Sequence, residues 1–224
     1  MTFSKELKEG TKKSHSAAEN TSFVKNFLKG VVNKESYRKL VANFYFVYRA
    51  LEEQLEKYKD NPVIEPIYFK DLNRVPFLEK DLIYYYGPTW REDIKPTEAC
   101  QQYVNRIREI EPKLLISHHY TRYIGDLSGG QILKRIAQNA LSLSEGEGLY
   151  FYDFPAIPDP KGFKVQYRNV LDTLSLDEQD HNAIIVEANY DFRLNIYMFD
   201  ELEGNAFKSF LKILCSLIRG KTLK

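Results

Sequence analysis

The placement of proline most limits what this chain can fold into. All nine prolines fall within residues 62–112 and 155–160, so the stretches 1–61, 113–154 and 161–224 contain none. Long helices need such stretches, because proline removes a backbone hydrogen bond and clashes with the preceding turn. Alternating strand patterns are scarce, and no Asn-Gly or Asp-Gly hairpin turn occurs. We therefore predict an all-α fold.

Periodic apolar residues and capping residues predict where helices begin. Between residues 37 and 58, apolar side chains recur at three- and four-residue steps after a candidate N-cap at Asn33, the pattern of an amphipathic helix. Thr97 is a candidate N-cap for a further helix. Ser175 and Glu178 have the spacing of a capping box, which predicts that another long helix opens there.

Length and composition favour one soluble, intracellular domain. The chain has 224 residues, of which 43% are hydrophobic and 14% aromatic, so it can bury a sizeable core and is not disordered. Its net charge of +1 argues against nucleic acid as a partner. No apolar run approaches the roughly 18 residues of a membrane span, so we expect no transmembrane anchor. Its two cysteines lack a CxxC spacing, which fits a reducing compartment.

Charge is unevenly distributed behind this near-neutral total. Residues 1–39 carry nine basic and four acidic side chains, and residues 205–224 carry five basic and no acidic ones. The acidic excess lies between them, most densely in residues 161–204. We divide the chain into a domain, residues 1–204, and a basic amphipathic C-terminal helix or tail, residues 205–224, which could dock on the domain, a partner or a membrane surface.

The first candidate site is a stripe on the N-terminal helix. Lys8, Lys12, His15 and Glu19 are spaced by four, three and four residues, so they share one helix face. A neutral imidazole ligates iron, copper or zinc, and a carboxylate one turn later can orient its surroundings. A solvated His–Glu pair is the alternative.

The other histidines fit a ligand site less well. His118 and His119 are adjacent, so on a helix their side chains diverge by about 100° and do not easily share one ligand. His181 lies in an acidic helix start, where we expect it to be exposed.

The second candidate site is a glycine-rich run, YTRYIGDLSGGQ at residues 120–131, inside an otherwise helical pattern. Gly125, Gly129 and Gly130 each cost a helix roughly 1 kcal/mol relative to alanine. A kinked helix whose bare backbone approaches a flat ligand would offset this cost, and Asp126 would place a carboxylate there. Tight packing against another helix is the alternative. The run also contains LSGGQ, the signature of ABC-transporter ATPases, but the Lys and Ser/Thr of a phosphate-binding loop are missing.

Together these residues resemble the haem oxygenase family. The resemblance runs from about Leu7 to Leu202. It is carried by YTRYIGDLSGGQ, by KEGTKKSHSAAEN at residues 8–20, by DLIYYYGPTW at residues 81–90 and by FRLNIYMF at residues 192–199. The sequence is most similar to the soluble cyanobacterial and plastid members.

The resemblance implies an all-helical, single-domain fold that holds haem between the first helix and the glycine-kinked helix. His15 would be the axial ligand of the haem iron, with its imidazole held by Glu19. The catalytic residues would be Tyr48, Arg122, Gly125, Asp126, Gly129, Gly130 and Asn195. The remaining haem-binding residues would be Lys8, Tyr120, Lys164 and Arg168 at the propionates and Phe192 in the pocket wall.

The implied activity is cleavage of haem b at the α-meso carbon by O₂ and electrons, giving biliverdin IXα, CO and Fe²⁺. Haem would be substrate and cofactor together. Electrons would come from reduced ferredoxin or a reductase, and the basic chain ends would dock that acidic donor. The implied compartment is a bacterial cytoplasm or a plastid stroma. A non-catalytic haem carrier or sensor is the alternative, against which Asp126 and the glycines argue.

Overall fold

The computed structural model describes residues 1–144 and 146–202, and these residues form helices, turns and loops without a strand. The predicted all-α fold is confirmed. Residues 205–224 lie outside the described part of the chain, so the helix or tail predicted there stays a prediction. Among the described residues, no helix is both long enough and apolar enough to cross a membrane.

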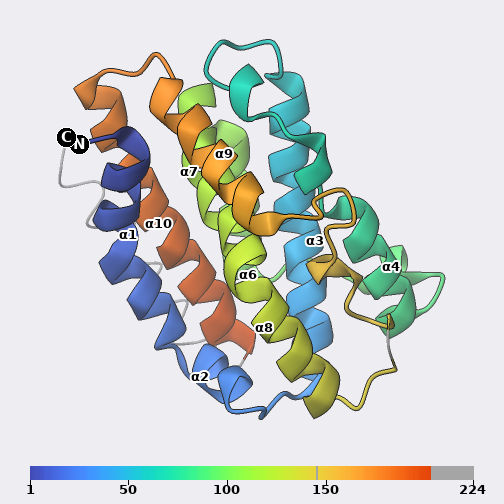
Figure 1. The fold of residues 1–224 in the computed structure, drawn as a ribbon. Helices are drawn as coiled ribbons and strands as arrows, with labels where there is room; N and C mark the ends of the chain where they lie inside the picture. The colour runs from blue at the N-terminus through green and yellow to red at the C-terminus, as the bar shows by residue number, and fades with distance from the viewer. Residues whose placement is uncertain (145, 203–224) are drawn as a thin grey trace.

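Two helices from opposite ends of the described chain lie side by side (Figure 1). α1 (Phe3–Glu19) packs along α10 (Glu178–Leu202). Gly10 permits this close approach, because a Cβ atom there would lie 2.7 Å from Cγ2 of Ile185. The short helix α2 (Ser22–Leu28) follows α1 and also contacts α10.

The rest of the core is built around α3 (Lys34–Lys57), which packs against α4 (Val75–Tyr86) and α6 (Glu98–Glu109). The side chains of Asn33 and Thr97 each accept a hydrogen bond from a backbone N–H in the first turn of α3 and α6, so both predicted caps are confirmed. The apolar stripe of α3 is buried, as its periodicity predicts.

Short helical pieces fill the proline-bearing connections. They are η1 (Glu65–Ile67), η2 (Lys70–Leu72), α5 (Trp90–Asp93), η3 (Pro112–Leu114) and η5 (Tyr150–Tyr152).

The start of α10 differs from the prediction. The capping box predicted at Ser175 is wrong, since the helix begins at Glu178. Asp177 and Asp180 take that place: the backbone N–H of Asp180 donates to Oδ1 of Asp177 at 2.8 Å, and the N–H of Asp177 faces Oδ2 of Asp180 at 3.4 Å. Two carboxylates satisfy free N–H groups at a helix start and also suit its positive dipole end.

A segmented helical rod runs through the middle of the molecule and carries the glycine run (Figure 1). It consists of α7 (Leu115–His119), the π-helical turn η4 (Tyr120–Ile124) and α8 (Gly125–Ala140). The departure from α-helical geometry therefore lies immediately before the glycines. A π-turn inside a helix often marks a functional site. The remaining helix, α9 (Pro160–Thr173), contacts both α1 and α8.

Candidate active site

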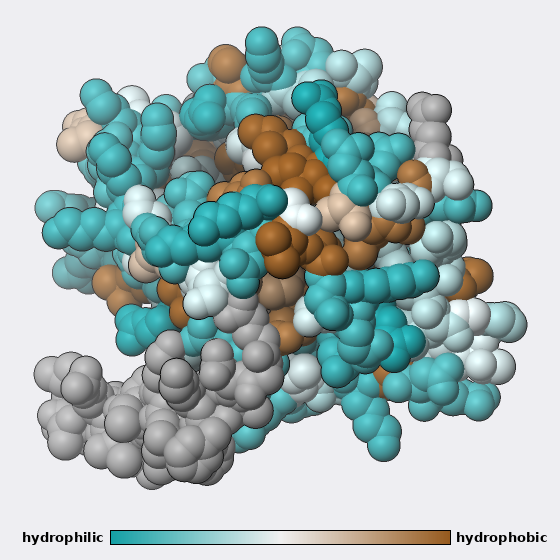
Figure 2. Space-filling view, turned by 90° about the horizontal axis from the view of Figure 1, so that it is seen from below, coloured by the Kyte–Doolittle hydropathy of each residue, from teal (hydrophilic) through white to brown (hydrophobic). Residues whose placement is uncertain are grey.

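A cavity of about 320 Å³ lies between α1 on one side and η4 and α8 on the other. Aromatic and aliphatic side chains from α2, α3, α8 and α10 make up much of its wall, among them Phe23, Phe27, Leu40, Phe44, Leu133 and Phe199. Two exposed hydrophobic side chains, Leu28 and Ile132, also line it. Seen from below, the molecule gathers hydrophobic surface near the middle of this face, ringed by hydrophilic residues (Figure 2).

A second cavity of about 480 Å³ adjoins the first and is bordered by basic side chains. The two share His15, Thr121, Gly125, Ser128 and Phe192. The second is further lined by Lys8, Lys12, Tyr120 and Arg168. Together they form a slot that is apolar at one end and cationic at the other.

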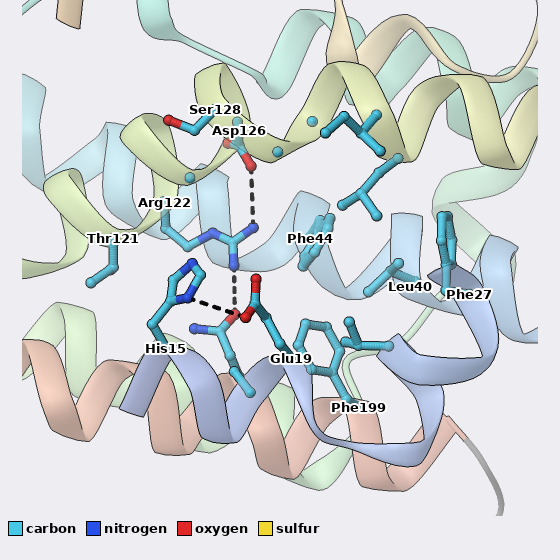
Figure 3. A pocket seen from close by; sticks show the side chains of 18 of the residues that line it. His15, Glu19, Phe27, Leu40, Phe44, Thr121, Arg122, Asp126, Ser128 and Phe199 are labelled. Atoms are coloured by element: carbon cyan, nitrogen blue, oxygen red, sulfur yellow. Dashed lines mark hydrogen bonds and ion pairs between the residues drawn. The ribbon is translucent and has the colours of Figure 1, made fainter. Parts of the chain in front are cut away.

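One wall of the slot presents His15, whose side chain is 58% exposed. Its Nδ1 lies 3.6 Å from Oε2 of Glu19, and its ring packs edge-on against Phe192 with centroids 5.7 Å apart. Figure 3 shows the imidazole pointing from α1 toward the facing helix. An imidazole whose Nδ1 faces a carboxylate offers its Nε2 electron pair to a metal ion.

The opposite wall presents a buried cluster around Asp126. Tyr48 on α3 donates a hydrogen bond to Oδ2 of Asp126. Arg122 donates from Nε to the Tyr48 hydroxyl at 3.0 Å and from Nη1 to Oδ1 of Asn195 at 2.5 Å, and its Nη2 lies 3.6 Å from Oδ1 of Asp126. Side chains from α3 and η4 thus contact the Asp126 carboxylate, and Asn195 of α10 binds Arg122. Figure 3 shows Arg122 beside Asp126.

Burial controls the protonation of this cluster. It raises the pKa of Asp126, although the Arg122 charge and the Tyr48 hydrogen bond act in the opposite direction. Burial also raises the pKa of Tyr48 well above its ordinary value, so the tyrosine stays a hydrogen-bond donor. A carboxyl group with a raised pKa beside a cavity is suited to holding and releasing a proton.

Two of the three glycines face open space. A Cβ atom added at Gly125 or Gly129 would meet no other side chain or remote backbone within 4 Å. Tight helix packing is therefore the wrong explanation for these two positions. At Gly130 a Cβ would meet Cδ1 of Tyr152 at 3.3 Å, so packing does apply there.

Lys164 approaches the slot from α9 without lining either cavity. Its Nζ donates to Oγ of Ser128 at 3.2 Å, so it lies beside the cationic end. Lys8 and Arg168 are exposed, and Tyr120 is half-buried.

The other three histidines have protein partners. His118 lies between Glu187 and Asp191, and His119 pairs with Tyr167. Nδ1 of His181 donates a hydrogen bond to Oε2 of Glu6 at 2.9 Å, and the side chain is 23% exposed, so its expected exposure is wrong. Within the described residues, no cluster of three or more His, Cys, Asp or Glu side chains could hold a bare metal ion. A metal at His15 would therefore need most of its ligands from another molecule.

Comparisons with known proteins agree on one family. The Heme oxygenase family model matches residues 1–201. A heme oxygenase of Porphyra purpurea is 55% identical over 222 residues, covering 98% of this chain and 94% of the relative. Heme oxygenase 1 of Nostoc sp. is 55% identical over 218 residues, covering 96% and 92%. The crystal structure of heme oxygenase-1 from Synechocystis sp. in complex with heme superposes with a TM-score of 0.89 at 52% identity, covering 97% of this chain and all of that one.

The chain belongs to the haem oxygenase family. Its activity is the oxidative cleavage of haem to biliverdin, with O₂ and electrons from a reductant. The resemblance seen in the sequence and the enzyme class inferred from it are confirmed.

The residues that line the slot fit haem. A flat apolar ring with two carboxylates on one edge matches a slot that is apolar at one end and bordered by Lys8 and Arg168 at the other. A porphyrin supplies four of the iron ligands, so haem would need only an axial ligand from the protein, and the His15 imidazole at the slot could supply one. The open space beside Gly125 and Gly129 would let the backbone of α8 lie against such a ring.

Sequence reasoning missed the groups behind the Asp126 cluster. Asn195 donates to Oδ1 of Asp191 at 3.0 Å, and Tyr103 donates a hydrogen bond to the same carboxylate oxygen. Asp191 precedes Asn195 by four residues and so shares its helix face, which is the signal that could have found it.

Proposed function

We propose that this protein binds haem b in the slot through His15 and cleaves it at the α-meso carbon to biliverdin IXα, CO and Fe²⁺. Haem, as the substrate, supplies the iron that binds dioxygen and the ring that is oxidised. The observation that carries the proposal is the facing pair of walls: a histidine with one free nitrogen opposite a buried carboxylate, with an apolar space between them.

On the α1 wall, Glu19 keeps the His15 imidazole oriented, and Phe192 restricts rotation of the ring. The 3.6 Å separation of Nδ1 and Oε2 and the edge-on ring contact support these roles. A carboxylate next to a ligating imidazole fixes its tautomer and raises its basicity.

On the α8 wall, Asp126 is the group that holds and releases protons. Tyr48 and Arg122 hold its carboxylate in place, and Asn195 holds Arg122, so Asp126 anchors water beside the site where dioxygen binds. Its raised pKa supports a role in passing protons toward that site. Gly125, Gly129 and Gly130 keep the backbone bare, so that α8 lies close to the ring and shields its other edges from oxidation.

At the cationic end, Lys8, Tyr120, Lys164 and Arg168 hold the two propionates. Charge-assisted hydrogen bonds to carboxylates are short and directional, so they fix how the ring is rotated in its plane. This rotation decides which meso carbon is presented to the Asp126 wall, and hence which biliverdin isomer forms.

The electron donor is an acidic protein of the ferredoxin type that docks on the basic surface of α1. Four lysines there, Lys5, Lys8, Lys12 and Lys13, are exposed beside the cationic end of the slot. Opposite charges accelerate encounter, and added salt screens them. Turnover with ferredoxin should therefore fall as ionic strength rises, and turnover independent of salt would contradict this assignment.

The red-algal and cyanobacterial sources of the relatives support a cytoplasmic or plastid-stromal location.

Reconstitution tests the proposed function. The purified protein is mixed with haemin, then given reduced ferredoxin, O₂ and catalase, while the Soret band, a biliverdin band and released CO are followed. Loss of the Soret band with biliverdin IXα and CO supports the proposal. A Soret band that survives reduction and O₂ indicates a haem carrier instead, and no Soret band overturns haem binding itself.

A further inference from the structure

The buried cluster around Asp126 does not end at Asn195 but continues through α10 to the surface. Asn195 donates to Asp191, and Nδ1 of His118 lies 3.6 Å from Oδ1 of the same aspartate. On its other side, Nε2 of His118 lies 3.0 Å from Oε1 of Glu187. Glu187 is paired with Arg106, whose side chain is 38% exposed.

The surroundings of His118 favour a doubly protonated, cationic ring. Both nitrogens face carboxylate oxygens, and ionised carboxylates only accept hydrogen bonds. Among the described residues, Nδ1 has no hydrogen-bond partner, and its contact with Asp191 at 3.6 Å is an ion-pair distance. Burial opposes a charge on the fully buried ring, but the Asp191 and Glu187 carboxylates outweigh it and raise the pKa of His118 to about 9.

Positive and negative groups then alternate along the whole chain of contacts. They run from Arg106 to Glu187, His118 and Asp191, and then through the Asn195 amide to Arg122 and Asp126. With His118 charged, these three cations balance three carboxylates. Without that charge, one carboxylate is in excess inside the protein, where unpaired charge is costly.

We propose that His118 is a positioning residue for the haem-cleaving site: its cationic ring neutralises Asp191, so that the charge of Arg122 is left for Asp126. Asp191 lies close enough to act on Arg122, since it is one of the groups that raise the pKa of that guanidinium against the effect of burial. This inference rests on the proposed role of Asp126.

The adjacent His119 provides an internal control. It is also fully buried, but its Nδ1 pairs with the hydroxyl of Tyr167 at 2.7 Å and its ring stacks on that tyrosine. Burial without a carboxylate lowers the pKa of His119 to about 3, so this ring is neutral. Two neighbouring histidines of equal burial thus differ in charge, because only one faces carboxylates.

No opposing charge from the packed elements changes this assignment. α7 packs against α3, α10, η3 and η4, and the ring of His118 also contacts Tyr103 of α6. The charged and titratable groups that these elements turn toward His118 or its partners are Tyr48, Tyr103, Arg106, Arg122, Glu187 and Asp191. Lys113 of η3 is paired with Asp180 instead.

The first test uses the protein without haem, so it stands even if haem cleavage is not observed. The pKa of His118 is raised in the folded state, so its stabilising effect is complete below about pH 6.5 and is lost as pH rises through about 9. Wild-type Tm should fall by on the order of 5 °C across this window. His119→Gln should keep that slope and His118→Gln should lack it. Equal slopes in the wild type and both variants would overturn the proposal.

The second test measures whether the charge of His118 influences ionisation in the haem-binding slot. In the ferric haem complex, the midpoint of the pH-dependent absorption change reports ionisation of the distal water. In His118→Gln, the uncompensated Asp191 should raise this midpoint by on the order of half a unit. His119→Gln should leave it unchanged, and His118→Gln/Asp191→Asn should restore it because that variant removes one charge of each sign.

The double variant also covers the case in which His118→Gln alone fails to fold. It replaces an ion pair by a neutral pair of similar shape, so it should fold and show a flat Tm profile between pH 6.5 and 9. A wild-type slope in the double variant, or a midpoint that stays raised in it, would show that His118 does not act through charge.

Discussion

The two walls of the haem slot are built in opposite ways. The α1 wall offers His15, which is 58% exposed and is oriented by Glu19 of its own helix and by the ring of Phe192. The α8 wall offers Asp126, which is buried and held by groups from α3, η4 and α10. Binding a metal needs one well-aimed electron pair, whereas controlling a proton needs a surrounding that sets the charge of an acid.

This contrast predicts different consequences of mutation. On the α1 wall, a substitution should remove haem ligation with little effect on folding, because the altered atoms face solvent. On the α8 wall, a substitution should leave haem bound but change the reaction, and it should also affect stability because buried partners lose their hydrogen bonds.

The largest effect is expected for His15→Ala. Removal of the iron ligand should lower haem-cleaving activity by on the order of 100-fold or more. The Tm of the haem-free protein should stay within about 2 °C of the wild type. Added imidazole should restore the ligated spectrum. His181→Ala is the matched control, since His181 also contacts α1, through Glu6, but lies outside the slot; unimpaired turnover in His15→Ala would refute the ligand assignment.

The next effect is expected for Asp126→Asn. An amide keeps the size of the side chain but cannot hold and release a proton, so biliverdin yield should fall by about 100-fold. Haem should bind with nearly unchanged affinity, as titration of the Soret band would show. Tyr48→Phe should lose less, because it removes one of the groups that hold Asp126 rather than Asp126 itself. A normal biliverdin yield in Asp126→Asn would mean that the cluster is structural.

A third, smaller effect should distinguish Gly129 from Gly130. Gly129→Ala adds a methyl group into open space, so the haem-free protein should gain about 1 kcal/mol of unfolding free energy from helix propensity. The same methyl group should weaken haem binding by about tenfold, if the ring lies against this backbone. Gly130→Ala should gain less stability because Tyr152 must move. Gly129→Ala with unchanged haem affinity would argue against a close approach there.

The smallest effect is expected for Arg168→Gln at the exposed cationic end. Exposed ion pairs contribute about 1 kcal/mol or less, so haem should bind about five times more weakly. The fraction of α-isomer among the biliverdin products should also fall. The control changes the ligand: haem dimethyl ester lacks the propionate charges, so wild type and variant should bind it equally. If Arg168→Gln lost as much affinity for the ester as for haem, the effect would not arise at the propionates.

Local signals in the sequence determined most of the fold. Proline placement and apolar periodicity predicted helices, and Asn33 and Thr97 cap them as expected because capping depends only on a few neighbouring residues. The prediction at Ser175 failed for an equally local reason: Asp177 and Asp180 form the reciprocal pair of contacts two positions further along the chain than Ser175 and Glu178. The His15–Glu19 stripe was visible because both residues lie on one helix.

Only the tertiary structure decided the rest. The glycine run predicted a bare surface for a flat ligand, and tight packing against another helix was an equal alternative. The structure decides against packing at Gly125 and Gly129, because both face open space. His118 and His119 look alike in the sequence, but they differ in charge because only His118 meets carboxylates from α10. Helix periodicity is a property of neighbouring residues, whereas the pKa of a buried group depends on which distant charges folding brings to it.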